Sequence, residues 1–182
     1  MTCVVGLISG DEVWLGSDSA AVDENGSLQH VRSKVVRPSA PPVRQLLLGY
    51  TTSFRVGQLL QYHLALPTRT KRVDPERYVI QQLVPAIRET FRDGGWMKKD
   101  AERESGGDFL VGYAGRLFRV QSDFSVLEPT SGYEAIGSGR YEALGALFAT
   151  GGMAARERVE TALRAAECFN GTVRGPFVVE KL

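Results

Sequence analysis

Three residues near the start of the chain, Thr2, Asp18 and Lys34, carry side chains that could act together on a carbonyl group. Removal of Met1 would make Thr2 the N-terminal residue, with a nucleophilic hydroxyl and a base on the same residue. A free α-amine titrates near pKa ~8, so a neutral fraction exists at cellular pH to accept the hydroxyl proton. The chemistry that this terminus would allow is attack of a threonine hydroxyl on an amide.

Asp18 and Lys34 lie sixteen and thirty-two residues after Thr2. Asp18 ends the second half of an expected hairpin, which would return it to the start of the first strand. Lys34 stands among valines in an expected strand, where a buried ammonium group needs an acidic partner, and Asp18 is the candidate. The alternative is an exposed lysine on the polar face of that strand. A Lys–Asp pair beside a hydroxyl would lower the cost of negative charge developing on oxygen.

The elements that would position these residues are read from hydrophobic periodicity and turn chemistry. Asp74 and Pro75 are typical of a helix start, and Pro85 should kink or split that helix. Residues 94–107 are expected to form a charged loop. The expected elements, in chain order, are strands 2–8, 12–18, 28–36 and 43–50, helices 53–66 and 74–92, a hairpin at 108–122, strands 124–127 and 133–136, helices 141–149 and 153–169, and a strand at 177–182.

This order groups strands with strands and helices with helices, so it does not predict a doubly wound parallel sheet. It favours two stacked antiparallel sheets between helix pairs, a four-layer αββα sandwich of the α+β class. The length of 182 residues fits one domain spanning 1–182.

Composition excludes several classes of function. The chain has 22 basic and 21 acidic side chains, so no global field would attract nucleic acid or an anionic membrane. Cys3 and Cys168 lie far apart and near no metal-ligand spacing, which predicts reduced thiols in a cytoplasmic protein. His30 and His63 have no partner at close spacing, so each is expected to be a surface or packing residue. No metal and no cofactor is predicted.

Several segments resemble one known family. Thr2, Asp18 and Lys34 at these separations look like the active site of proteasome β-type subunits, which are N-terminal nucleophile hydrolases. The segment LGSDS at 15–19 is similar to the family's Gly/Ala-Ser-Asp-Ser segment. The segment AIGSG at 135–139, which leads into a helix, is closest to bacterial HslV-type peptidases. The resemblance covers nearly the whole chain and implies the N-terminal nucleophile hydrolase fold.

The resemblance also implies roles for the matching residues. The hydroxyl of Thr2 would attack a peptide carbonyl, its own amine would act as the base through a water, and Asp18 and Lys34 would orient and tune the nucleophile. Ser138 would hydrogen-bond the terminal amine. The Gly-Ser-Gly turn around Ser138 has other interpretations, a phosphate-binding loop or a helix N-cap, but no Walker-type lysine follows it.

Further positions match the substrate side of the family's site. The backbone N–H of Thr52 matches the oxyanion-hole donor, although relatives are rich in Gly and Ala where this chain has Thr51 and Thr52. Ala21, Gly49 and Tyr50 match the substrate-binding positions. Tyr50 would fill much of the primary specificity pocket, which indicates small or modest apolar side chains in the substrate.

The C-terminal part departs from the family at one point. Cys168 stands where many relatives place an aspartate near the serine, which changes proton handling at the amine. HslV-type relatives can hold a sodium ion on backbone carbonyls in this segment. The matching positions in this chain are Glu167, Asn170 and Val173.

The leading hypothesis is therefore a threonine-type endopeptidase subunit of a self-compartmentalising, proteasome-like protease that cleaves unfolded proteins or peptides. Relatives stack two rings and receive unfolded chains from a hexameric AAA+ ATPase, so a homo-oligomeric double ring and such an ATPase partner are what the resemblance implies. Two alternatives stay open. One is an inactive ring or scaffold subunit, and the other is a self-contained amidohydrolase that acts on a small amide.

Overall fold

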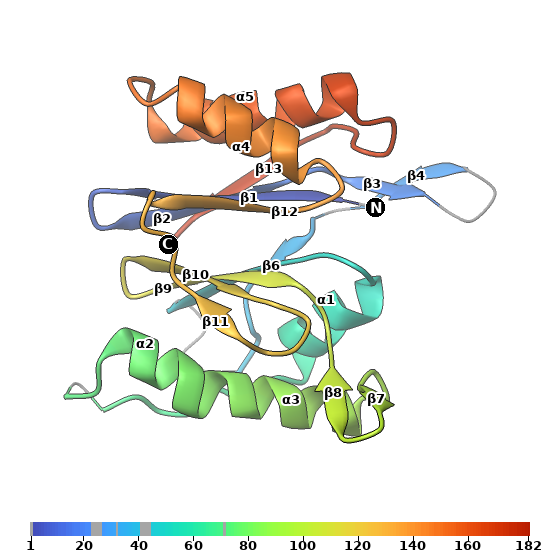
Figure 1. Cartoon of the computed structure of the whole chain (residues 1–182), viewed down its shortest axis with the longest axis vertical. Helices are drawn as coiled ribbons and strands as arrows, with labels where there is room; N and C mark the ends of the chain where they lie inside the picture. The colour runs from blue at the N-terminus through green and yellow to red at the C-terminus, as the bar shows by residue number, and fades with distance from the viewer. Residues whose placement is uncertain (1, 23–26, 32, 41–44, 71) are drawn as a thin grey trace.

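The computed structural model describes residues 2–22, 27–31, 33–40, 45–70 and 72–182. Its elements form four layers, with two antiparallel sheets in the middle and helices outside (Figure 1). The first sheet has four strands, and both β1 and β2 lie in its interior. Its strand order is β12 (Tyr133–Gly137), β1 (Cys3–Ser9), β2 (Glu12–Ser17) and β13 (Val178–Lys181).

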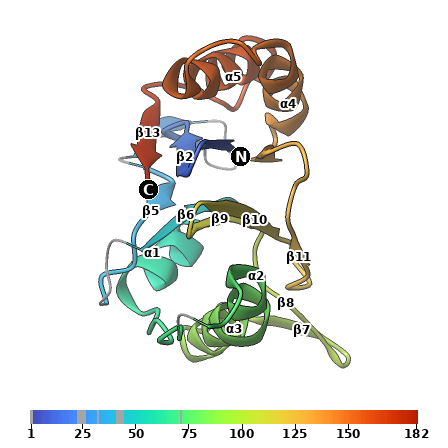
Figure 2. The same cartoon turned by 90° about the vertical axis from the view of Figure 1, so that its left-hand side faces the viewer.

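The second sheet has five strands and lies face to face with the first (Figure 2). Two separate two-stranded ribbons project from the layers, β3 (Ala20–Val22) with β4 (Leu28–His30) and β7 (Lys98–Asp100) with β8 (Arg103–Ser105). The order of the second sheet is β11 (Val126–Leu127), β10 (Arg116–Val120), β9 (Phe109–Tyr113), β6 (Leu46–Tyr50) and β5 (Val35–Val36).

Helices cover the outer face of each sheet (Figure 1). Helices α4 (Arg140–Ala149) and α5 (Ala155–Phe169) pack on the first sheet. The second sheet is covered by α1 (Phe54–Tyr62), α2 (Pro75–Tyr78), the π-helix η1 (Val79–Leu83) and α3 (Val84–Asp93). The predicted four-layer αββα sandwich is confirmed.

Three hydrophobic clusters correspond to the three spaces between the layers. Strand β1 shows why: Val5 joins the cluster under α4 and α5, whereas Val4 joins the cluster between the sheets. Successive side chains of a strand point to opposite faces, so a strand buried on both sides must be apolar throughout. This burial explains the unbroken apolar run of β1.

The helix starts follow the sequence signals. The side chain of Ser53 accepts a hydrogen bond from the N–H of Arg55 at the start of α1, and that of Asp74 accepts one from Glu76 at the start of α2. The expected split at Pro85 is present, because η1 interrupts the helix and Pro85 lies in the first turn of α3. No helix among the described residues is both long and apolar enough to span a lipid bilayer.

Two expectations on secondary structure were wrong. Residues 94–107 do not form a plain loop, because they contain the β7–β8 ribbon, whose Glu104 pairs with Arg88 and Arg92 of α3 at 2.6 Å each. Residues 28–36 are not one strand, and Lys34 lies outside the two short strands, just before β5. Its N–H bonds to the side-chain hydroxyl of Ser17 of β2 at 3.1 Å and not to the backbone of a neighbouring strand.

Candidate active site

Thr2 lies at the entrance of β1 and is only 6% exposed. Its carbonyl oxygen packs against Gly137 of β12, at which a Cβ atom would lie 2.0 Å from that oxygen. Gly137 also has φ +95°, a left-handed conformation that L side chains rarely adopt. Glycine at 137 therefore lets the chain approach Thr2 closely. Met1 lies outside the described residues, so its predicted removal stays a prediction.

The β1–β2 hairpin brings Asp18 beside Thr2. Val4 pairs with Ser17 in this hairpin, and the N–H of Asp18 then bonds to the carbonyl of Cys3 at 3.2 Å. The Asp18 carboxylate accepts hydrogen bonds from the N–H groups of Cys3 at 3.0 Å and Ala20 at 3.1 Å. These bonds fix both carboxylate oxygens of a side chain that is fully buried.

Lys34 supplies the positive charge that faces this carboxylate. Its Nζ atom lies 2.8 Å from Oδ1 of Asp18, and the two side chains are 1% and 0% exposed. Burial lowers the pKa of Lys34, while the charge of Asp18 acts in the opposite direction. The alternative of an exposed lysine is thereby excluded, and the buried Lys34–Asp18 ion pair lies next to the N-terminal segment.

Thr2 and Lys34 line one pocket of about 240 Å³. Ala21 and Tyr50, two of the predicted substrate-binding residues, line the same pocket. The third, Gly49, is not among its lining residues: a Cβ atom there would lie 2.5 Å from Val4, so this position faces the core between the sheets. The full lining is Thr2, Ala20, Ala21, Val22, Lys34, Tyr50, Thr51, Thr52, Ser53 and Phe54.

Tyr50 forms a fixed wall of this pocket. Its ring lies against Gly57 of α1, where a Cβ atom would approach it to 2.2 Å, and it makes an edge contact with Phe54 at 6.5 Å between ring centroids. Burial raises the pKa of Tyr50 to about 12. The hydroxyl donates a hydrogen bond to the carbonyl of Ser33 at 3.5 Å. These contacts leave the ring little freedom to move aside for a large substrate side chain.

Thr52 has a backbone conformation that is rare for its type. Its φ is +76°, a left-handed value that strains a β-branched residue. The neighbouring N–H groups are used within the protein: Thr51 donates to the carbonyl of Asp108 at 3.2 Å and Ser53 to that of Thr51 at 2.9 Å. Among the described residues, none accepts a hydrogen bond from the Thr52 N–H. Thr52, a lining residue of the pocket that contains Thr2, thus combines a strained backbone with an N–H that has no acceptor among the described residues.

Ser138 contacts the backbone nitrogen of Thr2. Its hydroxyl accepts a hydrogen bond from that N–H at 3.3 Å and lies 3.1 Å from the hydroxyl of Thr172. The Thr172 hydroxyl donates to Oδ1 of Asn170 at 2.7 Å, and the amide of Asn170 donates to the carbonyl of Ser138 at 2.9 Å. Cys168, which was matched to the acidic position of relatives, is exposed, and Asn170 with Thr172 stands next to Ser138 instead. Asn170 marks the C-terminal cap of α5, which turns it toward Ser138.

The three carbonyl oxygens matched to a sodium site converge on a side chain of this protein. Nη1 of Arg174 lies 3.3 Å from the carbonyl oxygen of Glu167, 3.2 Å from that of Asn170 and 2.6 Å from that of Val173. A sodium ion on these three oxygens would overlap this guanidinium group, so the residues present do not fit the ion. The sequence reasoning overlooked Arg174, although its position directly after Val173 could have drawn attention to it.

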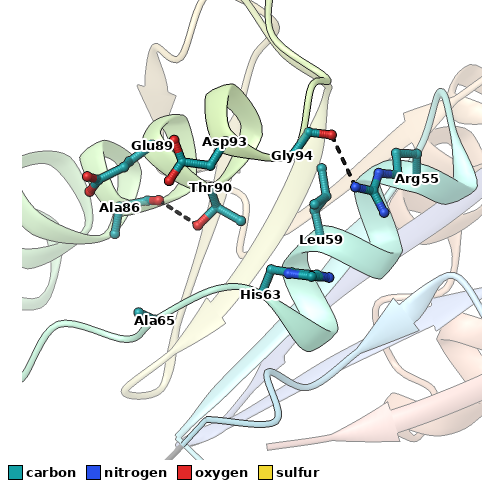
Figure 3. Close-up of a pocket in the computed structure, with 9 residues that line it drawn as sticks. All are labelled: Arg55, Leu59, His63, Ala65, Ala86, Glu89, Thr90, Asp93 and Gly94. Carbon is teal, nitrogen blue, oxygen red and sulfur yellow. Dashed lines mark hydrogen bonds between the residues drawn. The ribbon is translucent and has the colours of Figure 1, made fainter.

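A second cavity, of about 310 Å³, lies between α1 and α3 (Figure 3). Arg55 and His63 face it from α1 and its end, and Glu89 and Asp93 face it from α3. The guanidinium of Arg55 bonds to the carbonyl of Gly94 at 3.1 Å. This cavity shares no lining residue with the pocket of Thr2, so it is separate from the candidate active site.

Comparison with known proteins rests on structure. No protein-family model and no curated protein matches the sequence. Among solved structures, BPH of Thiobacillus denitrificans matches with a TM-score of 0.78 and 18% identity, covering 100% of this chain and 97% of that one. HslV from Trypanosoma brucei matches with a TM-score of 0.69 and 20% identity, covering 100% of this chain and 99% of that one. Anbu, an ancestral β-subunit from Yersinia bercovieri, matches with a TM-score of 0.67 and 16% identity, covering 99% of this chain and 81% of that one.

Proposed function

We propose that this chain, which has the N-terminal nucleophile hydrolase fold of proteasome-type subunits, is a threonine-type peptidase subunit that uses Thr2 after cleavage of the bond to Met1. The observation that carries the proposal is that Thr2 and Lys34 line one pocket with Thr52, whose N–H has no acceptor among the described residues. A nucleophile, a buried cation and an oxyanion donor on one small pocket are the parts needed for acyl transfer.

The reaction would begin with attack of the Thr2 hydroxyl on a peptide carbonyl. Its proton would pass to the Thr2 amine through a water, and the N–H of Thr52 would donate to the oxyanion. The amine would then protonate the leaving nitrogen, which gives an ester between Thr2 and the acyl half of the substrate. Water would hydrolyse that ester. Lys34 would stabilise negative charge near the Thr2 hydroxyl, and Asp18 would hold Lys34 in place.

The dependence on cleavage before Thr2 follows from chemistry. A nitrogen acylated by Met1 has no basic lone pair, so Thr2 would be latent until that bond is cut.

The pocket wall made by Tyr50 supports a preference for small or modest apolar substrate side chains. The two free cysteines, Cys3 and Cys168, support a reducing, cytoplasmic setting.

Assembly into rings is part of the proposal. Three large aromatic side chains on and next to the α4–α5 layer are mostly exposed: Tyr141 at 78%, Phe148 at 80% and Phe169 at 77%. Exposed aromatics on a helix layer favour burial against another copy. A homo-oligomeric double ring fed by a hexameric AAA+ ATPase, with unfolded protein or peptide as substrate, is the assembly that we propose. The proposal includes no cofactor.

Intact-mass and native mass spectrometry test this proposal together. We expect protein without Met1 to gain the mass of epoxomicin, the compound present in one solved structure of BPH, with the adduct on Thr2. The Thr2→Ala variant should gain nothing, while Thr70→Ala, at an exposed position, should react as the unmodified sequence does.

Three outcomes distinguish the hypotheses. An adduct on Thr2 in a dodecamer or a larger assembly supports the proposal. A large assembly of correctly processed protein without an adduct contradicts it and favours the scaffold subunit. A reactive monomer or dimer contradicts the ring and favours the small-amide hydrolase, which the pocket of about 240 Å³ could also serve.

A further inference from the structure

We propose that Arg174 is a built-in cation that takes the place of a bound metal ion, and that it positions the Thr2 amine through Asn170, Thr172 and Ser138. Three backbone carbonyls converge on its Nη1 atom at 2.6–3.3 Å. The positioning part of this inference rests on the proposed function. The cation part concerns only the fold, so the two can be tested apart.

The first step concerns the end of α5. The last carbonyls of a helix have no partner within the helix, and the helix dipole places partial negative charge there. Glu167 lies in the last turn of α5 and Asn170 is its C-terminal cap. Because both carbonyls point toward Nη1 of Arg174, the guanidinium satisfies them and balances that partial charge.

The second step concerns the shape of the segment from 170 to 175. Arg174 reaches back to Val173 and Asn170, so the chain closes into a tight loop around its own side chain. The side chain of Glu167 accepts a hydrogen bond from the N–H of Gly175 at 2.8 Å, which closes the loop from the other side. An ion with three carbonyl ligands would impose the same curvature, but it would leave and return with its concentration.

The third step connects this loop to Thr2. The hydroxyls of Ser138 and Thr172 lie 3.1 Å apart, and both the N–H and the hydroxyl of Thr172 donate to Oδ1 of Asn170. The Ser138 oxygen accepts a hydrogen bond from the N–H of Thr2, and the Ser138 hydroxyl donates to the Thr2 carbonyl, each at 3.3 Å. The contacts therefore run from the Thr2 backbone through Ser138 and Thr172 to an amide oxygen that cannot take up a proton. This chain orients the amine without an acidic group.

The loop also reaches the other side of the site. The carbonyl oxygen of Arg174 accepts a hydrogen bond from the N–H of Ser19 at 3.0 Å, directly after Asp18. A displacement of Arg174 would thus disturb both the contacts of the Thr2 nitrogen and the segment that carries the carboxylate. The guanidinium is covalently part of the chain and cannot dissociate as an ion can, so the loop should keep its shape without added salt.

Substitution of Arg174 gives a test by chemical rescue. Arg174→Ala should leave three carbonyls facing an empty space that a free cation can enter. We expect its thermal midpoint to fall by several degrees and to rise again with NaCl or with millimolar guanidinium, whereas choline chloride at equal ionic strength should not raise it. Arg174→Lys keeps a cation and should need no rescue. Arg164→Ala, an exposed change on α5, is the matched control and should behave as the unmodified sequence does.

Peptide hydrolysis gives the readout for positioning. For Arg174→Ala we expect kcat to fall roughly 10- to 100-fold with KM little changed, and to recover with the same cations. A variant that melts lower but responds to no cation overturns the proposal, because Arg174 would then be only a helix cap. A variant with unchanged kcat overturns the positioning role. If the unmodified chain is inactive, the proposed function fails, while the melting series still decides on the built-in cation.

Discussion

Nζ of Lys34 lies 2.8 Å from Oδ1 of Asp18, and neither side chain is more than 1% exposed. Removal of one partner from such a pair leaves an uncompensated buried charge, which costs about 3–5 kcal/mol. We therefore expect Asp18→Asn and Lys34→Met each to lower the free energy of unfolding by about 3 kcal/mol. The double variant should lose much less than the sum, and urea unfolding of all four proteins measures this. Additive losses would show that the two groups do not interact.

The same substitutions should affect activity differently from stability. Lys34→Met removes the cation beside the nucleophile, so we expect kcat/KM for a peptide to fall by at least about 10²-fold. The double variant should be as inactive as Lys34→Met even though it loses much less stability than the sum of the two single variants. Recovery of activity in the double variant would contradict a direct role of Lys34.

The left-handed backbone of Thr52 allows an unusual prediction. Relief of its strain by glycine should raise the free energy of unfolding by about 1–2 kcal/mol. The extra conformational entropy that glycine loses on folding should lower it by only roughly 0.5–1 kcal/mol. Thr52→Gly should therefore be slightly more stable, by up to about 1 kcal/mol, and should keep its activity because the N–H remains. Thr51→Gly is the control and should be less stable, since the hydroxyl of Thr51 bonds to the carbonyl of Asp108 at 2.9 Å. Loss of stability in Thr52→Gly would contradict the strain.

Two helical glycines should respond in opposite directions to alanine. A Cβ atom at Gly57 would lie 2.2 Å from the ring of Tyr50, so Gly57→Ala should cost about 1–3 kcal/mol and push that ring into the pocket. Gly145 of α4 has nothing within 4 Å, so Gly145→Ala should gain about 0.5–1 kcal/mol. Thermal unfolding measures both. Equal effects at the two positions would show that Tyr50 is free to move.

Stability should fall at alkaline pH partly because of Tyr50. Its pKa is about 12 in the folded protein and near 10 when unfolded, so the unfolded state loses its proton first. The contribution of the neutral Tyr50 hydroxyl to the free energy of unfolding is fully present below pH 10 and is lost as pH rises toward 12. Burial shifts the pKa of Tyr78 and Cys3 in the same direction, and that of Lys34 in the opposite one.

The Tyr50→Phe variant isolates this contribution. Urea unfolding at pH 8 and pH 11 should show a smaller alkaline loss of stability in Tyr50→Phe than in the unmodified chain, by at most about 1.4 kcal/mol. Tyr62→Phe serves as the control, because Tyr62 is 66% exposed and its change should leave the alkaline loss as it was. An identical loss in all three proteins would rule out a buried, neutral Tyr50.

The sequence by itself determined the layers and the first part of the site. Grouped strands and helices predicted the four-layer sandwich, because periodicity reports which faces are buried. The separation of Thr2 and Asp18 was informative because a hairpin returns the chain to its start, a geometry set by local turn chemistry. Ser53, Asp74 and Pro85 marked helix boundaries for the same reason, since capping and proline effects act within one turn.

The tertiary structure decided what depends on distant segments. Ser138, Asn170 and Thr172 meet only because β12 lies beside β1 and the end of α5 returns to that edge. The left-handed turn at Thr52 and the placement of Gly49 toward Val4 depend on packing between the sheets, which overrides local preference. Arg174 is the sharpest case. Its charge is plain in the sequence, but three carbonyls from a helix end and a loop converge on it only in the folded chain.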